Sequence, residues 1–66
     1  MINLGDKYTL HSENGHDYSI EVININELRP PNMKYGCDVY DDNGNYASDV
    51  VFVGVDFFDK CNKCDD

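Results

Sequence analysis

Basic residues are scarce in this sequence. Its 66 residues include five Lys and Arg against thirteen Asp and Glu, which gives a formal net charge of −8. Proteins bind nucleic acid and anionic lipid through clustered Lys and Arg side chains, because these neutralise phosphate groups. The shortage argues against direct contact with DNA, RNA or a membrane surface. Two interpretations remain: the charge attracts a basic protein partner, or it only keeps a small protein in solution.

Long hydrophobic runs are also absent. The longest apolar stretch, Val50–Val55, has six residues and lies between Asp49 and Asp56, whereas a membrane-spanning helix needs about 20 apolar residues. The first six residues show neither the basic nor the apolar region of a signal peptide. Cysteine is limited to three residues, an odd number that does not suit a framework of disulfides. We therefore expect a cytoplasmic protein without a membrane segment.

The short length limits both fold and function. Residues 1–66 are expected to form a single small domain, and folding of such a domain buries only about 60% of the surface of the unfolded chain. The hydrophobic fraction of 41% is enough for a small core. The acidic charge is uneven, since residues 36–66 hold eight acids and two bases, whereas residues 1–35 hold five acids and three bases. Because an active site needs a cleft, a buried set of side chains and a supporting shell, we expect a protein that is not an enzyme.

Two pairs of alternating segments predict two β-hairpins. Apolar and polar residues alternate in Lys7–His11 and Tyr18–Val22, and the Asn-Gly pair between them is typical of a tight type I′ turn. Tyr35–Val39 alternates in the same way, and a second Asn-Gly pair separates it from Val50–Val55. This last segment is apolar on both faces, which predicts the most central strand. The alternation places eight side chains on the core face: Tyr8, Leu10, Tyr18, Ile20, Val22, Tyr35, Cys37 and Val39.

The alternation slips by one residue after Val22, because the next apolar residues are Ile23 and Ile25. A one-residue slip turns every later side chain to the other face of a sheet. We therefore expect either a β-bulge near Val22–Ile23 or a strand that bends round the corner of a barrel. Residues 26–32 contain two adjacent prolines, which favours a loop between the hairpins.

The end of the chain has a different pattern. Asp56 is a suitable N-cap for a short helical turn, and Phe57, Cys61 and Cys64 follow at the spacing of one helix face. Together these elements predict a mainly all-β fold with a short C-terminal helical turn. We expect a small antiparallel barrel or curled sheet of four to five strands built from two hairpins, and this plan resembles SH3-like barrels and, more weakly, OB-type sheets.

One motif has the spacing of a metal or redox site. Cys61 and Cys64 form a C-x-x-C pair, and together with Cys37 and one histidine, His11 or His16, they would give zinc its four ligands. The alternative is that Cys37 is a small buried core residue and that the other two are free thiols. A thioredoxin-like role does not fit, because such a pair lies at the N-terminus of a helix that follows a strand.

The other motifs give no sign of catalysis. Asp41–Asn45 resembles part of a calcium loop, but Val39 and Val50 then fall at the positions where the loop needs acidic ligands. The two histidines flank the first turn, and the serines lie outside any nucleophile motif. We therefore expect neither catalytic residues nor a cofactor.

Acidic and tyrosine residues gather in the second half of the chain and form our candidate binding face. An array of carboxylates can imitate a phosphate backbone, and tyrosine is enriched at protein interfaces. The alternative is ordinary solvation and protection of a sheet edge. The candidate residues are Asp38, Tyr40, Asp41, Asp42, Tyr46, Asp49, Asp56 and Asp59.

These features lead to three hypotheses. In the first, the chain is a non-enzymatic binding protein that occupies the nucleic-acid site of a basic partner. Its size, acidity and content of Asn, Asp and Tyr resemble those of phage-encoded inhibitors of host enzymes, such as anti-restriction and anti-CRISPR proteins. In the second, zinc stabilises the domain through the cysteines. In the third, the chain self-associates, as a homodimer, through the apolar segment Val50–Val53.

Overall fold

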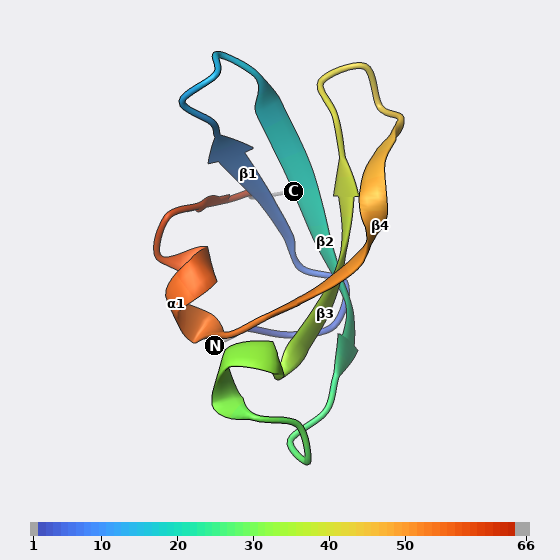
Figure 1. Ribbon diagram of the computed structural model, residues 1–66, viewed down its shortest axis with the longest axis vertical. Coiled ribbons are helices and arrows are strands. Elements are labelled where there is room, and N and C mark those ends of the chain that lie inside the picture. Colours follow the sequence, from blue (N-terminus) through green and yellow to red (C-terminus); the bar gives the residue numbers. More distant parts are fainter. Residues whose placement is uncertain (1, 65–66) are drawn as a thin grey trace.

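The structure, a computed structural model, describes residues 2–64, apart from the side chains of residues 48 and 49. Within this part of the chain, five antiparallel strands form one sheet (Figure 1). A 3₁₀-helix, η1, precedes β3, and a short helix, α1, follows β4. The elements are β1 (Lys7–His11), β2 (Asp17–Ile25), η1 (Pro31–Met33), β3 (Tyr35–Tyr40), β4 (Tyr46–Val53), α1 (Val55–Phe58) and β5 (Asn62–Lys63).

The sheet is curled and open. Its strand order is β4-β3-β2-β1-β5, so β4 and β5 lie at its two edges. In Figure 1 the β1–β2 and β3–β4 hairpins diverge towards their tips, and α1 lies beside the lower half of the sheet. The prediction of a mainly β fold is confirmed, in its curled-sheet form rather than as a closed barrel.

The predicted bulge in β2 is confirmed. Val22 pairs with Cys37 and Asn24 pairs with Gly36, so that the intervening Ile23 has no separate partner on β3. Val22 is 1% exposed and Ile23 is 40% exposed. The extra residue returns Ile25 to the core side, where it packs against the buried cluster. The bulge therefore accounts for the one-residue slip of the apolar pattern in the sequence.

The first hairpin turn differs from the prediction. A type I′ turn requires positive φ at both central residues, but among the described residues only glycines have positive φ, including Gly15 at 86°. The Ser12 amide donates to the His16 carbonyl at 3.0 Å, and the Gly15 amide donates to the Ser12 carbonyl at 3.1 Å. The connection is therefore a three-residue loop with a left-handed glycine at its end, in which asparagine keeps an ordinary backbone conformation.

The second hairpin repeats this loop with a stronger side-chain contribution. The Asp41 amide donates to the Asn45 carbonyl at 2.8 Å, and Gly44 has a φ of 85°. One carboxylate oxygen of Asp41 accepts the amides of Asn43 and Asn45 at 2.9 and 3.0 Å. The acidic side chain of Asp41, the residue before the loop, thus accepts hydrogen bonds from two backbone amides of the hairpin end.

The position of β4 was predicted wrongly. The strand begins at Tyr46, four residues before the predicted start at Val50, and it is an edge strand rather than a central one. Its apolar outer face has a local cause: the Arg29 guanidinium lies 4.5 Å from the centre of the Phe52 ring. Arg29 also donates to the carbonyl oxygens of Met33 and Lys34 at 2.9 and 3.2 Å, so it fixes the loop against which Phe52 packs.

The helix begins earlier than predicted. Its N-cap is Gly54 rather than Asp56, and no side chain caps it. A Cβ atom at Gly54 would lie 2.6 Å from the Pro31 carbonyl oxygen, so the chain passes η1 at a distance that only glycine allows. Cys64 does not lie on a helix face, because the chain extends after α1 and pairs with β1 as β5.

The core consists of five residues of the sheet and one residue of α1. The buried residues are Tyr8, Ile20, Val22, Tyr35, Cys37 and Phe58. The ring of Phe58 lies 4.7 Å from that of Tyr8 and 5.5 Å, edge to face, from that of Tyr35. The five sheet residues were predicted. Phe58 was not, because the predicted helix face began with Phe57.

Replacing Phe58 with alanine should remove most of the stability of the domain. Truncation of a buried Phe to Ala lowers the free energy of unfolding by about 3–5 kcal/mol. The whole free energy of unfolding of a domain is only roughly 0.05–0.15 kcal/mol for each residue. Urea denaturation followed by circular dichroism measures the change. Leu28→Ala is the control, because Leu28 is 96% exposed and its truncation should change stability by less than about 0.5 kcal/mol. Equal effects of the two variants would contradict this packing.

Candidate protein-binding surfaces

Two tyrosines, one exposed and one half-buried, lie side by side on the outer face of the β3–β4 hairpin. Tyr40 pairs with Tyr46 across the two strands, and their rings are stacked with centres 4.8 Å apart and planes at 24°. Tyr46 is 66% exposed. Stacked rings on a two-stranded ribbon form a flat, rigid surface that loses little side-chain entropy when a partner binds.

Carboxylates adjoin the tyrosines. Asp38 lies two residues before Tyr40 on the same face of β3, and Glu21 lies directly opposite Asp38 on β2. Like charges that face each other across a sheet repel each other. Lys7 pairs with Glu21 from the β1 side, so the row of three is Lys7, Glu21 and Asp38.

The two carboxylates affect the neighbouring phenol. The hydrogen bond with Tyr46 is the largest cause that raises the pKa of Tyr40, and partial desolvation and the negative charges of Asp38 and Glu21 add to it. Together these causes raise the pKa of Tyr40 to about 12. Tyr40 is therefore a neutral hydroxyl beside two carboxylates at physiological pH.

The hairpin tip contributes two more acids with different roles. Asp41 is committed to its own loop through the two amides described above. Asp42 lies 3.3 Å from His16 Nδ1, a contact that links the tips of the two hairpins, and its side chain is 46% exposed. Asp42 is thus the tip carboxylate that a partner can reach.

Five of the eight predicted binding residues lie together. We call the outer surface formed by them and Glu21 the acidic hairpin face. Its residues are Glu21, Asp38, Tyr40, Asp41, Asp42 and Tyr46.

A small hollow adjoins the acidic hairpin face. It has a volume of about 240 Å³. Lys7, Ser19, Glu21, Tyr40 and Cys64 are among the residues that line it.

The other predicted residues lie elsewhere. Asp56 is in the first turn of α1 and Asp59 is its C-cap, and α1 lies away from the tip of the β3–β4 hairpin (Figure 1). Asp49 belongs to β4, but its side chain is outside the described residues. Sequence spacing alone did not separate the acids of the hairpin from those of the helix.

The proposed zinc ligands do not assemble. Cys37 is fully buried, and burial raises the pKa of its thiol to about 11, which disfavours a thiolate ligand. Cys64 Sγ lies 3.2 Å from Thr9 Oγ1, and His11 Nδ1 lies 2.7 Å from an Asp17 carboxylate oxygen. Within the described part of the chain, no three His, Cys, Asp or Glu side chains form a group that could hold a metal ion.

Sequence reasoning missed an apolar hollow on the inner face of the sheet. Its volume is about 410 Å³, and both hairpins and Phe57 of α1 line it. The alternation in the sequence had placed most of the residues that line it on the core face. It could not show how little of that face α1 covers. Its lining residues are Leu10, Tyr18, Ile20, Val39, Ala47, Val51, Val53 and Phe57.

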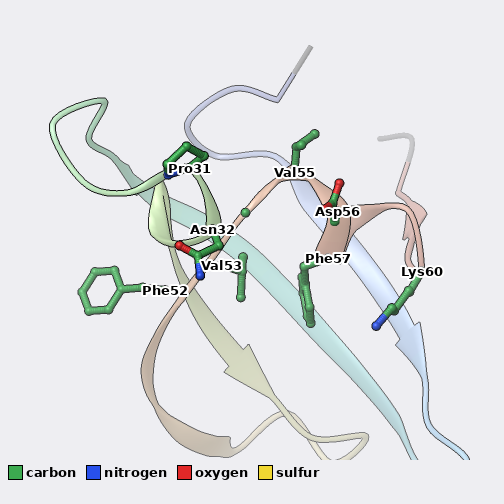
Figure 2. A pocket seen from close by; sticks show the side chains of 9 residues that line it. Pro31, Asn32, Phe52, Val53, Val55, Asp56, Phe57 and Lys60 are labelled. Atoms are coloured by element: carbon green, nitrogen blue, oxygen red, sulfur yellow. The ribbon is translucent and has the colours of Figure 1, made fainter.

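A second hollow of about 410 Å³ lies between η1 and α1. Figure 2 shows Pro31 and Asn32 on one side of it and Val55 and Phe57 on the other. Asp56 and Lys60 also line it, and they are its charged residues.

Comparison with protein-family models, with curated proteins and with solved structures gives no match for this chain. No helix in the described part of the chain is long and apolar enough to span a membrane.

Replacing Tyr46 with phenylalanine should lower the pKa of Tyr40 from about 12 towards its usual value of 10.0, because the largest cause of the shift is lost. In the native protein the folded state keeps this proton at pH values between 10.0 and about 12 while the unfolded chain releases it, so stability falls as pH rises through this range. Ultraviolet absorbance of tyrosinate during alkaline titration measures the shift. Tyr18→Phe is the control and should leave the late ionisation of Tyr40 in place. Because burial also raises the pKa of Tyr8, the assignment is contradicted if as many tyrosines ionise late in Tyr46→Phe as in the native protein.

Proposed function

We propose that the protein is a non-enzymatic binding protein whose acidic hairpin face docks on the basic, nucleic-acid-binding surface of a partner protein. The observation that carries the proposal is the facing pair Glu21 and Asp38 beside the stacked rings of Tyr40 and the exposed Tyr46. Glu21 and Asp38 are like charges on neighbouring strands, with Lys7 on the other side of Glu21, and a cation from a partner would be attracted to both carboxylates.

The chemistry of the face suits arginine and lysine. A guanidinium group forms paired hydrogen bonds with a carboxylate and stacks on an aromatic ring. The hollow beside Tyr40 offers both kinds of partner, since Glu21 and Tyr40 line it together. The same arginine or lysine side chains of the partner would otherwise hold phosphate groups, so the protein would compete with nucleic acid.

An inhibitor of this kind resembles, in size and acidity, those that phages encode against host enzymes. It would act in the cytoplasm, where nucleic-acid enzymes of the host are found. Opposite charge on the two proteins speeds association, and salt screens this effect.

The proposal is tested with the protein as bait in a bacterial lysate, and the captured partner then serves as the probe. A DNA duplex should displace the protein from this partner, and the association rate should fall steeply with rising salt. The double variant Glu21→Gln, Asp38→Asn should weaken binding by about tenfold or more. The matched control Glu27→Gln, Asp59→Asn removes the same charge at two positions outside the acidic hairpin face, one of them the 82% exposed Glu27, and should change the affinity by less than about threefold.

Two results would overturn the proposal. Equal losses in the two double variants would mean that only net charge matters. Simultaneous binding of the DNA duplex and the protein to the partner would mean that the protein does not occupy the nucleic-acid site.

A further inference from the structure

The hollow on the inner face of the sheet and the hollow between η1 and α1 adjoin each other. Val53 and Phe57 line both of them, and in Figure 2 these two side chains point to the same side of the chain. Together the two hollows extend from Ala47 of β4, between the hairpins, to Val55 of α1, beside η1, where Phe52 from the outer face of β4 also lines them. We call the two hollows together the inner groove.

The inner groove is the part of the core face that the chain does not cover. In α1, which has four residues, only Phe58 is fully buried against the sheet. The groove residues Leu10, Val51 and Val53 pack against the core but stay partly exposed. Apolar surface releases about 25 cal/mol for each Å² that a partner covers, and exposed apolar grooves of this kind mark interaction sites.

The charge of the chain selects the occupant. A second copy would bring a formal charge of −8 against another −8, which opposes self-association through this face. Strand addition to the free edge of β4 is also opposed, because the pairing of β4 with β3 is irregular at two places, between Cys37 and Val39 and between Val39 and Tyr40, and bulges of this type protect edge strands. A basic segment meets neither obstacle.

Charged groups at the two ends of the groove support a basic occupant. Asp56 lines the end beside η1, and Asp17 lies with His11 at the tip of the first hairpin, at the other end. Lys60 is the cationic side chain among the described residues that line the groove.

We propose that the inner groove binds an amphipathic, positively charged segment of a partner protein. Its apolar side chains would pack over Val51, Val53 and Phe57, and its Lys and Arg side chains would reach the carboxylates at the two ends. The inference deepens the proposed function by naming the kind of segment that the basic partner contributes, and it rests on that function only for the positive charge of the partner.

A peptide of Leu and Lys tests the groove directly. The probe has about 14 residues, roughly four helical turns, with Leu at the spacing of one helix face, and its control is an isomer of the same composition with scattered Leu. Fluorescence anisotropy of the labelled peptides should show that the amphipathic isomer binds at least about tenfold more tightly, a difference of about 1.4 kcal/mol. Ala47→Gln, which adds a neutral side chain inside the groove, should abolish this preference.

The control variant is Val50→Gln, on the opposite face of the same strand, where Val50 is 41% exposed; it should keep the preference, and circular dichroism verifies that both variants fold. Equal binding of the two isomers, equal binding of a Leu and Glu peptide, or an intact preference in Ala47→Gln would overturn the proposal. A dimer in sedimentation that Ala47→Gln dissociates would assign the groove to a second copy instead. Glu21→Gln, Asp38→Asn should keep the peptide preference, so failure of the groove and failure of the acidic hairpin face are distinguishable.

Discussion

The structure depends on one packing constraint: a curled five-stranded sheet has to bury its inner face under a helix of four residues. Phe58 meets this constraint by placing its ring against Tyr8 and Tyr35, two aromatic residues from opposite halves of the sheet. The route of the chain serves this contact. Gly54 lets the chain pass close to η1 before α1 begins, and β5 then ties the end of the chain to β1, so that α1 is held from both sides.

The same constraint separates the surfaces that remain. A helix of one turn covers only part of the inner face and leaves the inner groove between residues of the two hairpins. The outer face has the opposite character, since carboxylates and tyrosines occupy the β2–β3–β4 rows. A larger domain would cover its inner face with more helix. In a chain of 66 residues, the uncovered apolar surface is a consequence of size.

The fold could be predicted where a local pattern determines it. Alternation identified the inward residues of β1, β2 and β3, and the phase slip after Val22 located the bulge. The edge position of β4 could not be read from its sequence, because the outward ring of Phe52 packs against Arg29 from a distant loop. Phe57 and Phe58 are neighbours of the same type, and only the entry angle of α1 decides which one is buried. Of the binding face, the hairpin acids were found, but spacing did not show that Asp56 and Asp59 lie elsewhere, or that the inner face stays open.

The two candidate surfaces lie on opposite faces of one edge strand. Tyr46 belongs to the acidic hairpin face, and Ala47, the next residue, lines the inner groove. A partner that used both surfaces would have to wrap round the edge of β4. The irregular pairing there opposes a regular added strand, so such a partner would be recognised through side chains rather than through backbone hydrogen bonds. Recognition by side chains makes the sequence of the partner decisive. A protein that has to distinguish its partner from other basic proteins needs this property, whereas a protein that binds any basic partner does not.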